Sequence, residues 1–160
     1  RSTVVSDGKS IVDLDAAIRG HLAERQDGQG LVDFTPIGQP IGVTMTETAL
    51  VRVLDNLMDN ALRYGGRADI VAERRGDHGA IVVGDRGPGI PEERRKEVLE
   101  PFVRLEESRN RDLGGSGLGL AIVRQILDAH GGTLCLEDRE GGGLNAVVLL
   151  PLAVMERRAA

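Results

Sequence analysis

Two asparagines and an arginine recur along a predicted helix in the stretch NLMDNALRYG. Asn56, Asn60 and Arg63 stand at i, i+4 and i+7, so they share one stripe on a helix surface. Asparagine is a poor helix former, and its repetition needs an explanation. One interpretation is a pair of partly buried amides that bond to neighbouring loops. The other is an amide oxygen that binds a hard cation, with an arginine one turn on to meet phosphate.

A single carboxylate precedes a glycine turn in the stretch VVGDRGPGIP. Asp85 ends a predicted buried strand and is followed by Gly87, Pro88 and Gly89. Glycines let a ligand approach the backbone closely. An ionised carboxylate accepts a hydrogen bond from an exocyclic amine, such as that of adenine. A simple Asp-Gly turn is the alternative interpretation.

A glycine cluster opens the stretch GGSGLGLAIV, residues 114–123. Leu120 stands where a P-loop has its lysine, and the third glycine of a dinucleotide fingerprint is also absent. A surface loop is one interpretation. The other is a helix N-terminus, whose free N–H groups and dipole bind an anion without a lysine.

The composition is typical of one ordinary domain. The chain has 160 residues, of which 41% are hydrophobic and 28% charged. The net charge of −5 argues against non-specific binding to nucleic acid. No apolar run approaches the roughly 20 residues of a membrane span. One cysteine excludes an internal disulfide, and three scattered histidines do not form a zinc cluster.

The elements that must position these residues follow from periodicity and turn signals. Apolar residues at helical spacing predict a helix at 47–65, with Leu50, Val53, Leu54 and Leu57 facing the core. Thr46 or Thr44 is its expected N-cap. The first ten residues are expected to be a linker or a frayed end. Further helices are predicted at 11–24, 91–100 and 117–130, and strands at 31–36, 41–45, 67–75, 79–86, 133–140 and 144–151.

Because most of these strands are expected to pair as hairpins, the fold class predicted from the residues is α+β. Asp55 and Asp59 fall on the opposite side of the helix at 47–65 from its apolar stripe. They are interpreted as solvated surface charge.

Taken in order, these stretches resemble the catalytic and ATP-binding domain of bacterial two-component sensor histidine kinases. NLMDNALRYG resembles the N box of that family, DRGPGI the G1 box, EPFVR the F box and GGSGLGLAIV the G2 box. The resemblance runs from about Leu31 to Pro151. It implies the GHKL (Bergerat) fold of gyrase, Hsp90 and MutL-type ATPases. That fold is a two-layer α/β sandwich, with a mixed, mostly antiparallel sheet on about three helices and a mobile ATP lid.

The resemblance also implies roles for residues of the asparagine helix. Asn60 would ligate the Mg²⁺ that bridges the ATP phosphates, and Asn56 would assist at that end. Arg63 would lie near the phosphates and Tyr64 would flank the nucleotide. Asn56, Asn60 and Arg63 are therefore the expected catalytic residues, with ATP and Mg²⁺ as cofactors.

The loops supply the other implied nucleotide contacts. Asp85 would bind the adenine amino group, Phe102 and Arg104 would begin the lid, and the glycine cluster would wrap the phosphates. The arginines of the lid, Arg109 and Arg111, are interpreted as solvated charge or as contacts to phosphate or a partner helix. The full set of loop contacts is Asp85, Gly87, Gly89, Ile90, Phe102, Arg104, Gly115, Ser116, Gly117, Leu118, Gly119 and Leu120.

One difference separates this chain from the gyrase-like and Hsp90-like relatives, in which the position of Asn56 resembles a glutamate that activates water. A neutral amide cannot act as that general base. We therefore expect transfer of the γ-phosphate to another nucleophile rather than rapid hydrolysis. None of His21, His78 and His130 stands in the pattern of the family's acceptor histidine, so the acceptor is expected on a separate dimerisation domain.

These implications predict the organisation of the chain. Residues 1–30 are expected to lead from the missing dimerisation domain, 31–155 to form the catalytic domain and 156–160 to be a tail. The expected partners are that dimerisation domain and a response regulator, with no nucleic acid. The fragment is expected to be cytoplasmic and not membrane-embedded, in a parent protein of the inner membrane. Two alternatives stay open: a serine kinase of the anti-sigma-factor type and a non-catalytic nucleotide-binding module.

Overall fold

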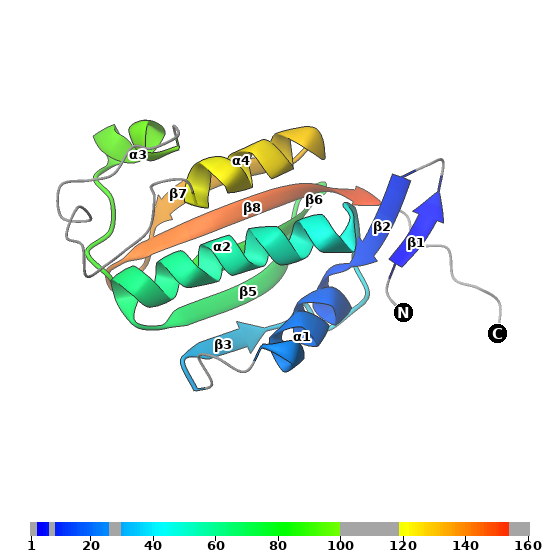
Figure 1. Ribbon diagram of the computed structural model, residues 1–160, viewed down its shortest axis with the longest axis horizontal. Helices are drawn as coiled ribbons and strands as arrows, with labels where there is room; N and C mark the ends of the chain where they lie inside the picture. Colours follow the sequence, from blue (N-terminus) through cyan, green and yellow to red (C-terminus); the bar gives the residue numbers. More distant parts are fainter. Residues whose placement is uncertain (1–2, 7–8, 26–29, 100–118, 154–160) are drawn as a thin grey trace.

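The computed structural model describes residues 3–6, 9–25, 30–99 and 119–153. A sheet forms one layer, and three helices lie on one of its faces (Figure 1). These helices are α1 (Leu14–Glu24), α2 (Glu47–Gly65) and α4 (Gly119–Ala129). The short helix α3 (Glu92–Val98) lies at one end of the molecule (Figure 1). The strands are β1 (Thr3–Ser6), β2 (Lys9–Asp13), β3 (Val32–Thr35), β4 (Gly42–Thr44), β5 (Ala68–Arg75), β6 (His78–Gly84), β7 (Thr133–Asp138) and β8 (Leu144–Ala153).

The sheet is mixed and mostly antiparallel, as expected. Its strand order is β1-β2-β4-β8-β6-β5-β3, and β7 also pairs with β8. Only β3 and β5 pair in parallel among the described strands. The hairpins predicted for β5–β6 and for β7–β8 are both confirmed. Together with the helical layer this gives the predicted two-layer α+β fold.

The N-terminal end differs from its prediction. Ile11 and Val12 belong to strand β2, where they pair with Thr44 and Val43 of β4. The helix expected from residue 11 therefore begins only at Leu14. Part of the expected linker also forms a strand, because β1 pairs with β2 as a hairpin. Strand pairing with a distant segment decides these residues, and no local periodicity reports it.

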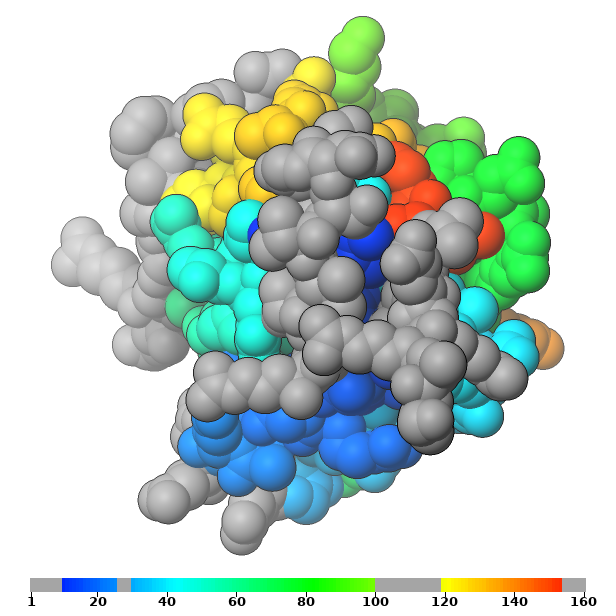
Figure 2. All heavy atoms as spheres, turned by 90° about the vertical axis from the view of Figure 1, so that its right-hand side faces the viewer, coloured from blue at the N-terminus to red at the C-terminus, as the bar shows by residue number. Residues whose placement is uncertain are grey.

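The packed core also includes this end of the chain. Leu14, Ala17 and Ile18 of α1 belong to the same buried cluster as the residues of α2 and α4. Figure 2 shows the blue, cyan, yellow and red segments of the chain side by side at this end of the molecule. Packing therefore continues across residue 30, where the sequence predicts a domain boundary. No described helix is long and apolar enough to cross a membrane.

Helix α2 has the boundaries and the buried stripe that the sequence predicts. Thr46 caps it, because its Oγ1 accepts a hydrogen bond from the N–H of Ala49 at 3.1 Å. Gly66 ends it in the left-handed conformation, with φ of 73°. The side chains that it buries against the sheet and α4 are Leu50, Val53, Leu54, Leu57, Met58 and Ala61.

The polar side of α2 contacts the C-terminal end of helix α1 through ion pairs. Asp55 Oδ1 lies 2.7 Å from Nε2 of His21 and 2.8 Å from Nη1 of Arg25. A second guanidinium nitrogen of Arg25 lies 3.2 Å from Asp59 Oδ1. The side chains of Asp55 and Asp59 are 40% and 56% exposed, so both are surface charges as interpreted, and the ion pairs with α1 are an additional feature that the interpretation did not include. The sequence did not reveal the pairing because their partners stand 30 or more residues away.

Candidate functional site

The first turn of α4 lies beside the two asparagines of α2. A Cβ placed on Gly119 would lie 3.4 Å from Oδ1 of Asn60 and 3.8 Å from Oδ1 of Asn56. Asn56 donates from Nδ2 to the carbonyl of Arg52 at 2.8 Å, so its amide is oriented by its own helix. Both asparagines are half-buried. The positive end of a helix dipole thus meets two amide oxygens.

Two further predicted residues continue along α2. Arg63 is exposed and forms no ion pair with another described residue. Tyr64 is half-buried, and its carbonyl oxygen would lie only 2.6 Å from a Cβ placed on Gly87. At Gly65 a Cβ would lie 2.8 Å from Cβ of Asp85. Glycines on both sides therefore let the end of α2 approach the loop that follows β6.

Asp85 occupies the expected place at the end of β6. Its N–H donates to the carbonyl of Leu144 at 2.9 Å, which extends the ladder of β6 and β8. Its Oδ1 accepts a hydrogen bond from the N–H of Gly87 at 2.8 Å, the geometry of an Asx turn. Burial raises the pKa of the Asp85 carboxyl, while the N–H groups of Gly87 and Leu144 and the charge of Arg139 oppose this rise.

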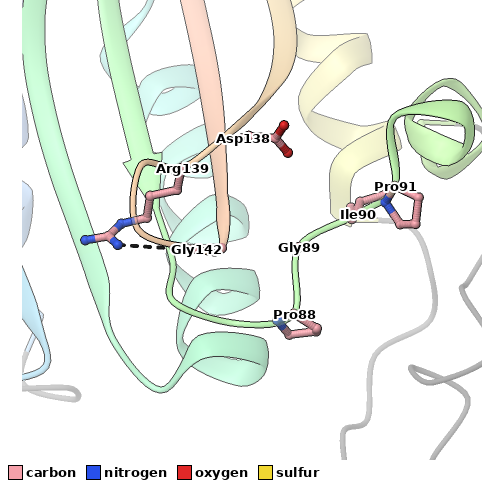
Figure 3. A pocket seen from close by; sticks show the side chains of 8 residues that line it. Pro88, Gly89, Ile90, Pro91, Asp138, Arg139 and Gly142 are labelled. Atoms are coloured by element: carbon pink, nitrogen blue, oxygen red, sulfur yellow. Dashed lines mark hydrogen bonds between the residues drawn. The ribbon is translucent and has the colours of Figure 1, made fainter.

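The loop after Asp85 faces the β7–β8 turn. Gly89 has φ of 74°, and a Cβ there would lie 3.4 Å from the carbonyl oxygen of Gly143. The loop carries three predicted nucleotide contacts, Gly87, Gly89 and Ile90. Between loop and turn lies an open cavity of about 330 Å³ (Figure 3). It is lined by Pro88, Gly89, Ile90, Pro91, Asp138, Arg139, Gly142 and Gly143.

This cavity is separate from the asparagines. Neither Asn56 nor Asn60 lines it, so it does not combine the cation-binding and adenine-binding groups. The candidate site instead extends along helix α2. From Asn56 to Gly65 that helix advances about 13 Å at 1.5 Å per residue. The α4 N-terminus lies near one end of this path and Asp85 near the other.

The structure thus gathers the predicted residues in two groups. Asn56, Asn60 and Gly119 meet at one end, while Tyr64, Asp85 and Gly87 meet at the other. Leu120 is half-buried and packs against the core. The remaining predicted contacts lie outside the described residues: Phe102, Arg104, Gly115, Ser116, Gly117 and Leu118.

The asparagine end suits a magnesium ion. Mg²⁺ takes hard oxygen ligands, and in nucleotide sites it uses one or two protein oxygens together with substrate phosphates. Asn60 Oδ1 is such an oxygen and lies beside the start of α4. No group of three or more His, Cys, Asp or Glu side chains gathers elsewhere in the described ranges as a competing metal site.

Sequence reasoning did not find two arginines that contact the loop region. Arg95 of α3 donates from Nε to the carbonyl of Ile90 at 3.0 Å and also pairs with Asp138. Arg139 in the β7–β8 turn bonds Asp69 on β5 at 3.1 Å. Both belong to charged stretches of ordinary composition, so only the folded chain identifies their partners.

Comparisons with known proteins show which family the chain is similar to. Residues 45–154 match a family described as histidine kinase-, DNA gyrase B-, and HSP90-like ATPase. The sensor protein RstB of Escherichia coli is 47% identical over 102 residues, which cover 63% of this chain and 24% of that protein. The sensor histidine kinase GtrS of Pseudomonas aeruginosa is 35% identical over 162 residues, which cover 98% of this chain and 32% of that protein.

Solved structures show the same likeness. The mycobacterial sensor histidine kinase MprB aligns with a TM-score of 0.73 and 30% identity, covering 91% of this chain and 98% of that one. The chain spans between 24% and 32% of the length of the curated relatives RstB and GtrS.

Proposed function

Because the chain belongs to the family of histidine kinase-, DNA gyrase B- and HSP90-like ATPases, we propose that it is the ATP-binding catalytic domain of a sensor histidine kinase. Two contacts of helix α2 carry the proposal. The N-terminus of α4 lies beside Asn56 and Asn60 of α2, and Asp85 lies beside Gly65 at the C-terminal end of α2. Along α2 the protein thus offers an anion-binding site at the α4 N-terminus and, in Asp85, an acceptor for a hydrogen bond from an amine. Such a pair of sites fits an adenine nucleotide.

The adenine end is built around Asp85. Its carboxylate accepts a hydrogen bond from the exocyclic amine, while Gly87 and Gly89 keep the adjoining backbone free of side chains. The half-buried position of Asp85 strengthens this bond, because a partly desolvated acceptor interacts more strongly than one in water. Tyr64 and Ile90 flank the base.

The phosphate end is built around the asparagines. Asn60 holds Mg²⁺ through its amide oxygen, and Asn56 assists at the metal and phosphates. When bound, the ion neutralises the charge on the triphosphate. The N–H groups at the start of α4 bind phosphate oxygens, and Arg63, exposed one turn beyond Asn60, adds a positive charge. Asn56, Asn60 and Arg63 therefore orient the γ-phosphate.

The chemistry follows from what Asn56 lacks. An amide does not take a proton from water, so hydrolysis is not activated at this position. The γ-phosphoryl group passes instead from ATP to a nitrogen of a histidine imidazole, and ADP leaves with the bridging oxygen. Positioning and charge neutralisation supply most of the catalysis in such a transfer.

The acceptor lies on another domain in this proposal. Among the three histidines, His21 bonds Asp55 and His130 bonds the carbonyl of Ile126 through Nδ1 at 2.8 Å, which are structural contacts. The dimerisation domain of the parent protein supplies the phosphorylated histidine, and a response regulator aspartate receives the phosphate. Residues 31–155 form the catalytic domain together with β2 and α1, which share its core. This domain acts in the cytoplasm, and the parent protein resides in the inner membrane.

The relatives favour this function over a serine kinase of the anti-sigma-factor type. GtrS carries the name of a sensor histidine kinase, and the aligned MprB structure carries the same one. A non-catalytic nucleotide-binding module is also disfavoured, because both asparagines, Asp85 and the loop glycines are present together.

Two measurements test the proposal. Calorimetry with AMPPNP is expected to show binding that depends on Mg²⁺ and is strongly weakened in Asp85→Ala. Labelled ATP is expected to leave the isolated chain unphosphorylated but to label a histidine when a separately expressed dimerisation domain of the same parent protein is added. Binding that survives Asp85→Ala would contradict the site, and phosphohistidine on the isolated chain would contradict a separate acceptor.

A further inference from the structure

An arginine outside the predicted site joins the β7–β8 turn to β5. Arg139 lies in this turn, and its Nη2 donates to Oδ2 of Asp69 at 3.1 Å. Strands β8 and β6 separate β7 from β5 in the sheet, so the side chain reaches across the ends of two strands. The two side chains are each 24% exposed, and the ion pair is therefore largely withdrawn from water.

This ion pair passes over Gly84, the residue before Asp85. Gly84 pairs with Asp69 in the β5–β6 ladder. A Cβ on Gly84 would lie 3.5 Å from Nε of Arg139 and 2.6 Å from Oδ1 of Asn145. The distance to Arg139 is ordinary van der Waals contact, so the guanidinium lies directly over Gly84 on its way to Asp69.

The turn that carries Arg139 also contacts the backbone of Asp85. The carbonyl of Leu144 accepts a hydrogen bond from the Asp85 N–H at 2.9 Å. Gly143 lies so close that a Cβ there would be 1.9 Å from the Asp85 carbonyl oxygen. Any movement of this turn is therefore transmitted to Asp85 through direct contact.

Arg139 stabilises the turn itself as well. Its N–H donates to the carbonyl of Gly143 at 3.1 Å. Its Nη1 lies 3.4 Å from the carbonyl oxygen of Gly142, a contact that Figure 3 marks by a dashed line. The same side chain thus bonds the turn at one end and β5 at the other.

We propose that Arg139 is a positioning residue for adenine recognition, which fixes the backbone of Asp85 by locking the β7–β8 turn to Asp69. This inference rests on the proposed function, in which Asp85 accepts the adenine amine. The positive charge of Arg139 also favours the ionised carboxylate that accepts the hydrogen bond from adenine, because it lowers the pKa of Asp85 against the effect of burial. Arg139 does not touch the nucleotide and acts through Asp85.

Calorimetric titration with ADP tests the proposal on the full chain. Arg139→Gln removes the charge and the ion pair, and we expect it to weaken ADP binding about fivefold, as for coupled residues in contact. The preference for ADP over GDP is expected to fall with it, because adenine carries at C6 an amine that donates a hydrogen bond to Asp85, whereas guanine carries a carbonyl oxygen at that position. Arg139→Lys keeps a charge opposite Asp69 and is expected to restore ADP binding to within about twofold of the wild type.

Asp69→Asn provides a second variant, should Arg139→Gln fail to fold. It leaves Arg139 in place but removes its carboxylate partner, and the same loss of ADP affinity is expected. The double variant is expected to lose no more than Asp69→Asn alone, because both substitutions remove the ion pair between Arg139 and Asp69, while Asp69→Asn also removes a longer contact to Arg86 at 3.7 Å. Arg75→Gln is the matched control. Arg75 also forms ion pairs with side chains of the sheet, those of Glu73 and Glu137. It lies at the end of β5 opposite to Asp69, so the Arg75→Gln variant is expected to bind ADP normally.

The outcomes separate the two proposals. If Asp85→Ala loses ADP while folded Arg139→Gln and Asp69→Asn keep wild-type affinity and ADP preference, the role of Arg139 is refuted and the proposed function stands. If Asp85→Ala itself binds ADP normally, the adenine site is refuted and the role of Arg139 with it. Equal weakening of ADP and GDP in Arg139→Gln would also refute adenine positioning.

Discussion

Replacing Gly119 by alanine separates nucleotide binding from stability at the start of α4. The added methyl group would lie 3.4 Å from Oδ1 and 3.5 Å from Nδ2 of Asn60, which is ordinary van der Waals contact. Nothing in the described protein therefore has to move. Alanine is a better helix residue than glycine by about 0.5–1 kcal/mol in a helix interior. The free energy of unfolding is thus expected to stay unchanged or to rise by up to about 1 kcal/mol.

Nucleotide binding is expected to change in the opposite direction. A cation held by Asn60 needs a Mg–O distance of about 2.1 Å, and phosphate oxygens must reach the first N–H groups of α4. A methyl group in contact with the Asn60 amide occupies the space between these partners. Hydrogen bonds to charged groups contribute about 1.5–3 kcal/mol each and the helix end about 0.3–1 kcal/mol. Loss of one such hydrogen bond together with the helix-end contribution predicts binding at least about 20-fold weaker.

Calorimetry with Mg²⁺ and AMPPNP measures the affinity, and urea unfolding measures the stability. Gly20→Ala is the matched control, because Gly20 lies exposed in α1 with nothing within 4 Å of an added Cβ. It is expected to gain similar helix stability without any change in affinity. A folded Gly119→Ala protein that binds the Mg²⁺ complex as tightly as the wild type would refute the placement of phosphate between α4 and the asparagines.

Three further predictions concern Asp85, Gly143 and Asp55. Because burial raises the folded-state pKa of Asp85, ADP affinity should fall as the pH is lowered through that raised pKa, which calorimetry across a pH series would show. The folded state then binds more protons than the unfolded state between the two pKa values, so this group lowers stability as the pH rises through that window. Asp85→Asn should therefore keep or raise the melting temperature at pH 7 while losing ADP; a lower melting temperature would contradict the desolvation argument. Gly143→Ala combines φ of 105° with a Cβ 1.9 Å from the Asp85 carbonyl oxygen, and urea unfolding should show a loss of at least about 2 kcal/mol; a near-neutral result would mean that the turn relaxes freely. Asp55→Asn removes partly exposed ion pairs to α1, and a loss of about 0.5–1 kcal/mol is expected, with no change in ADP affinity.

The sequence by itself determined the features that depend on local pattern. Helix α2 was predictable to its ends, because the apolar spacing, the Thr46 cap and the terminal glycines all act within a few residues. The β5–β6 and β7–β8 hairpins were predictable for the same reason. Asp85 and the asparagines also stood out, since their types are unusual for their places in a strand end and a helix.

Tertiary structure alone decided which distant residues meet. It placed Ile11 in a strand, because β4 offers a pairing edge that no local periodicity reports. It paired Asp55 with α1, and it joined Arg139 to Asp69, which are 70 residues apart. Charged side chains have nearly the same local pattern whether they face water or a partner. Their roles therefore emerge only when the sheet order brings particular strands and turns together.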